Sequence, residues 1–286
     1  MSDLKDKSNN LDFVSEETIK ARARNKKLRI HAIQLGLAVS LLVIWQVLAD
    51  HKIIDSFFFG KPLGIYQQLM TWIHNGTVAG SIWYNAGVTL AESTYGFLIG
   101  VVAGIIFGVT FARNQTIAEI FAPYIKVANS IPRVVLGSIF IVIWGLGSTS
   151  KIALAFVLVF FPVFFNAFQG TREADRKLIS NARLLGASKR QVTRQVVLPS
   201  ALSWIIASMH VSFGFAIIGA IVGEFLGSNH GLGLLIATAQ ATFNPNGVFA
   251  AMLLIAAMAL TAEWLITKLE NRLLKWRPKE VSDTEI

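Results

Sequence analysis

Three carboxyl side chains interrupt long apolar stretches of the sequence, namely Glu92, Glu224 and Glu263. An ionisable group inside hydrocarbon is costly, so such a residue faces the interior of a helix bundle, a water-filled path or another polar group. For Glu92 and Glu224 two roles remain open: a hydrogen-bonded carboxyl that joins helices, or a member of a translocation path. Glu263 lies near the end of its apolar stretch, where we expect it at the membrane interface.

One histidine also lies inside an apolar stretch. His210 has Ser208 and Ser212 as polar neighbours. The three could line a polar route through the membrane, although we favour a histidine whose hydrogen bonds are satisfied by helix packing. The translocation-path candidates are therefore Glu92, Ser208, His210, Ser212 and Glu224.

Catalytic and metal-binding patterns are missing from the sequence. There is no cysteine, and the five histidines are scattered without the spacing of metal ligands. No GxxxxGK[ST] phosphate loop, HExxH or GxSxG motif occurs. We therefore expect no catalytic residue, no metal and no cofactor on this chain, which is not predicted to be an enzyme.

Composition and apolar patterning indicate an all-α membrane protein. The chain is 53% hydrophobic and 15% charged, whereas soluble domains have about 25% charged residues. A spanning helix needs roughly 20 apolar residues. The third stretch is short and needs residues on both sides of Pro132 to cross. The six predicted spans are about 30–49, 88–112, 134–147, 152–168, 201–225 and 248–267.

The placement of Lys and Arg predicts the orientation. Of the 26 Lys and Arg residues, all but Lys52, Lys61 and Lys151 fall on one side of this six-span scheme. Loops rich in these residues stay in the cytoplasm. We therefore expect cytoplasmic tails at 1–29 and 276–286 around a transmembrane domain at 30–275, in the inner membrane. Because the basic residues act as a topology signal, a nucleic-acid partner is not expected, and contact with lipid is.

Glycines recur every four residues in the second span and near the outer end of the fifth. Small residues at this spacing let two helix backbones approach closely. The alternative is that glycine is simply frequent in membrane helices. The packing interpretation predicts close helix contacts, within the bundle or with a second copy, at Gly96, Gly100, Gly104, Gly108, Gly219 and Gly223.

A polar stretch at 171–199 interrupts the apolar pattern and is predicted to form two short helices. Thr171 can cap the first helix, and Gly186 sits where a left-handed terminating residue is expected. Ser188 and Gln191 form a capping box that begins the second helix. Pro199 either ends that helix or opens the next span. We expect either a cytoplasmic projection that transmits motion from a soluble partner or a helix pair lying on the lipid surface.

The stretch 186–199 also resembles a known signature. Gly186, Val196, Leu198 and Pro199 fit the "EAA---G---------I-LP" pattern of permease subunits of bacterial ABC importers. The segments "PYIKVANSIPRVVLGSIFIVIWGLGSTSKIAL", "FFPVFFNAFQG" and "GEFLGSNHGLGLLI" occur in the order typical of the nitrate/sulfonate/bicarbonate (taurine-like) branch. The Glu-Ala-Ala triplet falls on Ser180-Asn181-Ala182, so only its last alanine is kept.

This resemblance implies a type I importer permease with six spans. It implies a separate ATPase dimer that carries ATP and Mg, an external solute-binding protein and a second permease copy, in a homodimer or with a related subunit. It implies a path for a small, often anionic solute such as a sulfonate, nitrate, bicarbonate or organic acid. The alternative is a self-sufficient secondary carrier or channel, which would predict inverted repeats. The region implied to contact the ATPase comprises Leu178, Ala182, Arg183, Leu184, Leu185, Gly186, Ala187, Ser188, Lys189 and Pro199.

Overall fold

The computed structural model describes residues 16–173 and 176–273, and these residues are almost entirely helical. The chain divides into two compact units, at residues 1–63 and 64–286. In the first unit, α1 (Glu16–Asp50) is long and apolar enough to cross a membrane from Arg24 to Asp50. The short α2 (Ser56–Phe59) follows, capped by the Asp55 carboxylate, which accepts a hydrogen bond from the Phe57 amide.

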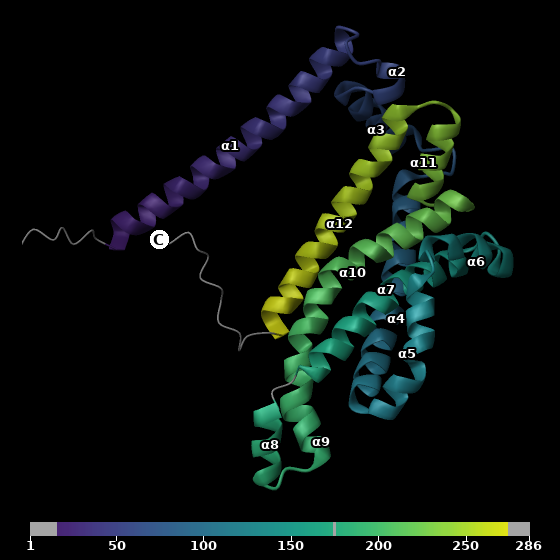
Figure 1. Cartoon of the computed structure of the whole chain (residues 1–286). Coiled ribbons are helices and arrows are strands. Elements are labelled where there is room, and N and C mark those ends of the chain that lie inside the picture. Colours follow the sequence, from purple (N-terminus) through teal and green to yellow (C-terminus); the bar gives the residue numbers. More distant parts are fainter. Residues whose placement is uncertain (1–15, 174–175, 274–286) are drawn as a thin grey trace, which may run out of the picture. The chain divides into compact units, whose positions relative to one another are not determined.

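The second unit contains four more helices that are long and apolar enough to span a membrane, together with shorter ones (Figure 1). The short α3 (Pro62–Asn75), which begins at the boundary between the units, forms where apolar residues recur at helical spacing after Pro62. The long helices are α4 (Ile82–Arg113), α7 (Ser148–Arg172), α10 (Leu198–Leu226) and α12 (Pro245–Leu273), and the short α11 (Leu232–Ala241) lies between the last two.

The segment between α4 and α7 is a bent pair of helices. The α5 helix (Gln115–Ser130) is followed by the 3-10 turn η1 (Arg133–Val135) and α6 (Leu136–Trp144), at an angle of 75°. The helix breaks at Pro132, because proline lacks an amide hydrogen and disfavours the helical conformation of the residue before it. Ile131 is accordingly extended (φ −73°, ψ 129°). The prediction that the third crossing needs residues on both sides of Pro132 is therefore confirmed. Counted as one broken span, the pair gives the described residues a sixth candidate crossing.

The backbone of α4 contacts α7 at the glycines of α4. A Cβ added at Gly100 would lie 2.7 Å from the Cβ of Val159, and one at Gly104 would lie 2.8 Å from that of Val163. Gly108 faces the Phe164 carbonyl in the same way, at 2.6 Å. Only a residue without a Cβ permits these contacts, so the helices pack through backbone and small side chains. Gly96 continues the row, against Ala155.

The α10 helix also packs closely against α7. A Cβ at Gly219 would lie 2.5 Å from the Ala155 Cα, and one at Gly223 would lie 2.9 Å from the Lys151 Cγ. Phe97 of α4 and Phe213 of α10 meet edge to face at 5.2 Å near this seam. The α4, α7 and α10 helices thus form the core of the second unit, with Val159, Val163 and Ala216 buried inside it.

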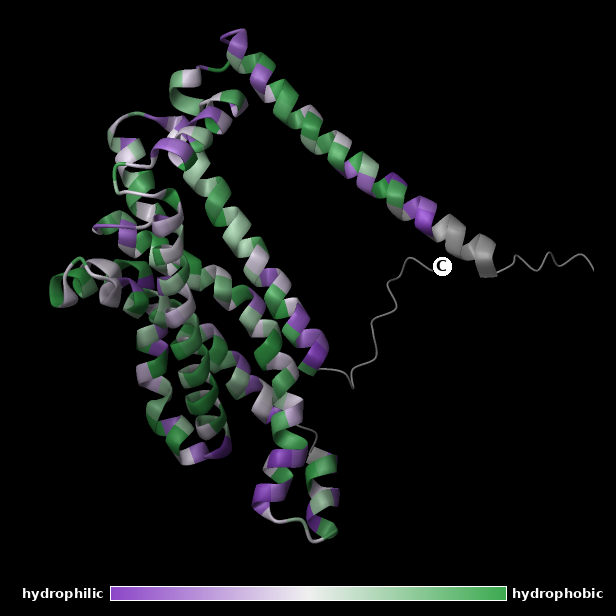
Figure 2. Cartoon of the chain, turned by 180° about the vertical axis from the view of Figure 1, so that it is seen from behind, coloured by the Kyte–Doolittle hydropathy of each residue, from purple (hydrophilic) through white to green (hydrophobic). Residues whose placement is uncertain are grey.

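The polar stretch forms a hairpin of α8 (Arg176–Leu184) and α9 (Lys189–Val192), in which hydrophilic residues alternate with hydrophobic ones (Figure 2). Gly186 has φ +85°. Its amide donates to the Arg183 carbonyl at 3.0 Å, and the Ala187 amide donates to the Ala182 carbonyl at 3.0 Å. These two bonds form a Schellman motif, which ends α8.

The start of the hairpin differs from the sequence prediction. Thr171 does not cap α8: it lies within α7, where its hydroxyl donates to the Ala167 carbonyl at 2.7 Å. The capping box of Ser188 and Gln191 is present as expected.

Of the two predicted roles of Pro199, ending the second helix is wrong, and opening the next span is confirmed, because Pro199 lies in the first turn of α10 (Leu198–Leu226). The second helix continues through a π-helical turn, η2 (Thr193–Val197), into α10. The Leu198 amide donates to the Thr193 carbonyl, which widens the turn immediately before the proline ring. The short α9 and the long α10 are therefore one continuous apolar helix from Lys189 to Leu226.

Candidate functional site

A buried polar cluster joins α4, α10 and the start of α11. The Glu224 carboxylate is fully buried and accepts hydrogen bonds from the Thr89 hydroxyl and the Gly233 amide, both at 2.7 Å. A carboxylate with two such donors is satisfied where it stands. The structure therefore favours the role in which Glu224 joins helices.

The same cluster fixes the loop before α11. The Gly231 amide donates to the Asn85 amide oxygen at 2.8 Å, and the Leu232 amide donates to the Thr89 hydroxyl at 2.9 Å. Gly231 has φ +111°, and a Cβ there would overlap the Glu224 carboxyl. Polar side chains of α4 thus bind the free amides at the N-terminus of α11.

Lys151 completes this cluster and was assigned by the charge pattern to an external loop. It is fully buried in the first turn of α7, where its ammonium donates to the carbonyls of Leu146 at 2.7 Å and Gly147 at 3.2 Å. It lies within the electrostatic influence of Glu92 and Glu224. Buried charged groups are usually paired. The two glutamates, Glu92 and Glu224, were therefore the signal in the sequence that could have identified Lys151 as a buried residue.

Glu92 differs from Glu224 in its hydrogen bonding. It is also buried, and it lies near Ser148 and Glu224, but its Oε2 atom has no hydrogen-bond partner among the described residues. Asn85, Thr89 and Glu92 continue the glycine row of α4 along the same helix face, and all are buried. This row is polar at one end and glycine-lined at the other.

His210 joins α10 to α12 some distance from that cluster. Its Nδ1 atom lies 2.6 Å from the Glu263 carboxylate and its Nε2 atom 3.0 Å from the Glu270 carboxylate. If both carboxylates are ionised, both ring nitrogens must carry a proton to make these contacts. Glu263 is therefore an ion-pair partner of His210, and Glu270 is a second one that was not predicted.

The five path candidates do not meet in one place. Ser208 donates to the Ile205 carbonyl at 2.6 Å, and the buried Ser212 hydroxyl has no partner within the described part of the chain. The structure thus separates the Glu92–Glu224 cluster from His210.

The hairpin presents a different kind of surface. Ala182 and Ala187 pack with Ile179 against the buried Val192 and Val197, so the inner face of the hairpin is apolar and closed. Leu184 and Leu185, beside Gly186, are 85% and 88% exposed. Two leucines on a braced polar tip are an exposed apolar feature of the kind that marks contact sites.

Comparison with known proteins identifies the family. Residues 100–275 match the model of the binding-protein-dependent transport system inner membrane component. The chain belongs to this family. The riboflavin transport system permease protein of Chloroflexus aurantiacus is 30% identical over 85% of this chain and 90% of its own length. The taurine transport system permease protein of Escherichia coli is 26% identical over 85% and 90%.

A solved structure of the MetNI methionine ABC transporter shares the fold of the permease. It has a TM-score of 0.55 at 20% identity and covers 67% of this chain and 94% of that one. The permease is thus a multi-pass protein of the cytoplasmic membrane in the sulfonate and taurine branch of ABC importers, and ATP hydrolysis belongs to a separate subunit. The named relatives handle different solutes, so family membership leaves the solute open.

Proposed function

We propose that this permease forms the translocation path for a small anionic solute and couples to its ATPase through the α8–α9 hairpin. ATP and Mg would bind on that partner, and an external solute-binding protein would deliver the solute. A second copy of the permease would complete the path, and both termini would lie in the cytoplasm, on the side to which the basic residues point.

The exposed apolar tip is the observation that carries the coupling proposal. Leu184 and Leu185 project from a hairpin whose fold is fixed by a Schellman motif and a capping box. A rigid tip of this kind fits a cleft on another protein at little cost in conformational entropy. The other residues implied by the family signature, from Leu178 to Lys189, lie on the same hairpin.

The route from the tip into the membrane is continuous. The α9, η2 and α10 segments form one helix, so a displacement at Ser188 is transmitted toward the buried helix core. The π turn before Pro199 is the place where this lever can bend, because hydrogen bonding is irregular there. Pro199 thus acts in the lever, and its contact with the ATPase is not required.

Replacing Gly186 with valine tests the coupling role. The residue has φ +85°, and a Cβ would have open space around it, so the change introduces backbone strain without a clash. We expect the strain, of about 1–3 kcal/mol, to distort the tip and weaken co-purification of the ATPase while membrane insertion stays normal.

The matched control is Gly186→Asn, because asparagine tolerates the left-handed region and should retain most of the ATPase. Wild-type recovery of the ATPase with Gly186→Val would contradict the proposed role of the tip.

A further inference from the structure

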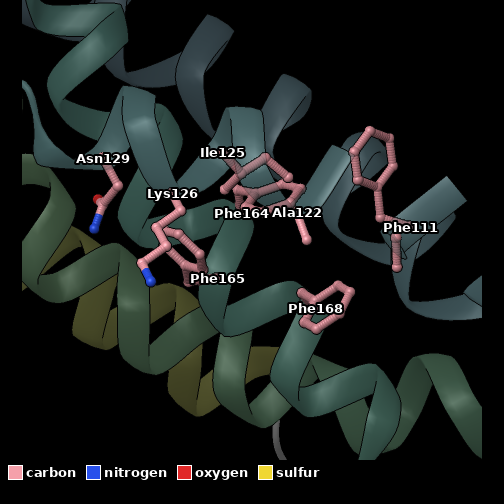
Figure 3. A pocket seen from close by; sticks show the side chains of 9 residues that line it. Phe111, Ala122, Ile125, Lys126, Asn129, Phe164, Phe165 and Phe168 are labelled. Atoms are coloured by element: carbon pink, nitrogen blue, oxygen red, sulfur yellow. The ribbon is translucent and has the colours of Figure 1, made fainter. Parts of the chain in front are cut away.

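A cavity of about 350 Å³ lies between the end of α4, α5 and α7 (Figure 3). Four phenylalanines line it, Phe111 from α4 and Phe164, Phe165 and Phe168 from α7. Its volume lies within the range of about 300–1,000 Å³ that is typical of small-molecule sites. Ala118, Ala122 and Ile125 of α5 complete the apolar lining, and Lys126 and Asn129 of the same helix are its polar members.

Lys126 and Arg133 are cations without nearby counter-ions in the described part of the chain. Lys126 and Asn129 lie on one side of α5, and the Arg133 guanidinium, beyond the break at Pro132, donates to the Asn129 amide oxygen. Neither Lys126 nor Arg133 has a carboxylate within 4 Å among residues 16–173 and 176–273. The Nε atom of Arg133 is buried without a hydrogen-bond partner there.

A second cavity of about 540 Å³ adjoins the first and shares Phe111, Ala118, Ala122 and Phe168 with it. Arg113 and Arg172 line this second cavity, together with Glu119. Positive side chains therefore follow one route from Lys126 to the ends of α4 and α7. A net positive lining in a low-dielectric cleft raises the local concentration of anions.

We propose that the Lys126 cavity binds a small organic anion with an apolar body. The acid group lies at Lys126 and Asn129, and the apolar body lies among the phenylalanine rings. The inference rests on the proposed role as a path for an anionic solute and adds the place where that solute is recognised.

Binding of 4-fluorobenzenesulfonate to the full-length chain in phosphatidylcholine nanodiscs tests the proposal, with ¹⁹F NMR as the readout. We expect saturable binding of this probe and no binding of the neutral 4-fluorobenzyl alcohol at equal concentration. Lys126→Gln should weaken binding about tenfold, since it removes a charged hydrogen-bond donor. Lys126→Arg should restore most of it, and Ala122→Trp should abolish it by filling both cavities.

Lys268→Gln is the matched control, because Lys268 of α12 lies over an aromatic ring, Trp264, at 5.1 Å and lines neither cavity. This variant should bind the probe as the wild type does. Equal binding of the neutral and anionic probes, or no effect of Lys126→Gln, would overturn the proposal and indicate an apolar groove filled by lipid. Because no ATPase is present in this measurement, its failure would leave the importer role intact.

Discussion

Replacing Glu224 with alanine should lower the free energy of unfolding by about 2–6 kcal/mol, because it leaves two buried hydrogen-bond donors unsatisfied at about 1–3 kcal/mol each. The change would leave the Gly233 amide and the Thr89 hydroxyl without their acceptor. It would also remove one of the two carboxyls beside the buried Lys151. Equilibrium unfolding in mixed micelles measures the effect.

Two variants make this test specific. Glu224→Gln keeps an acceptor oxygen and the side-chain shape, so it should destabilise the protein less than alanine does. Glu173→Ala removes an exposed carboxylate whose hydrogen bond is to Gln169, and should change stability by no more than about 0.5 kcal/mol. A Glu224→Ala protein as stable as Glu173→Ala would show that the cluster does not hold α4, α10 and α11 together.

Replacing Gly100 with leucine should destabilise the bundle by about 3 kcal/mol or more, because it overpacks a helix contact with no free volume. The first added carbon already lies 2.7 Å from the Val159 Cβ and 3.2 Å from the Phe156 carbonyl oxygen. The helices α4 and α7 must separate to admit the rest of the side chain. Thermal unfolding in detergent measures the loss.

The control lies on the same helix. Gly87 is exposed, and a Cβ there meets nothing within 4 Å. Gly87→Leu should therefore be neutral or stabilising by up to about 1 kcal/mol, since leucine has the higher helix propensity. Equal destabilisation by the two substitutions would mean that glycine spacing in α4 reflects composition and not close packing.

The features that could be predicted from the sequence are those determined by residues close together in the chain. Capping by Ser188 and Gln191, termination at Gly186 and the spacing of the α4 glycines depend on neighbouring residues, and each appears in the structure. Such features can be predicted from the sequence because the interactions that determine them join residues within one or two helical turns.

The functional clusters depend on contacts distant in sequence. The charge pattern alone assigns Lys151 to an external loop. In the structure it is buried near Glu92 of α4 and Glu224 of α10. Lys126 and Arg133 read as positive charges of a cytoplasmic loop, whereas Pro132 bends a helix pair there and places Lys126 in an aromatic cavity. Glu270 pairs with His210 across two helices, which no local pattern indicates.

Cross-linking from the hairpin tip tests the coupling role most directly. Because the chain has no cysteine, Leu185→Cys introduces a unique thiol at an 88% exposed position. A thiol–amine cross-linker applied to membranes of the native host should join this chain to a P-loop ATPase subunit, identified by mass spectrometry. Gln195→Cys, exposed on η2 away from the tip, should give little of that product. Absence of an ATPase from the Leu185→Cys products, or lipid adducts alone, would contradict the account and favour a hairpin that lies on the membrane surface.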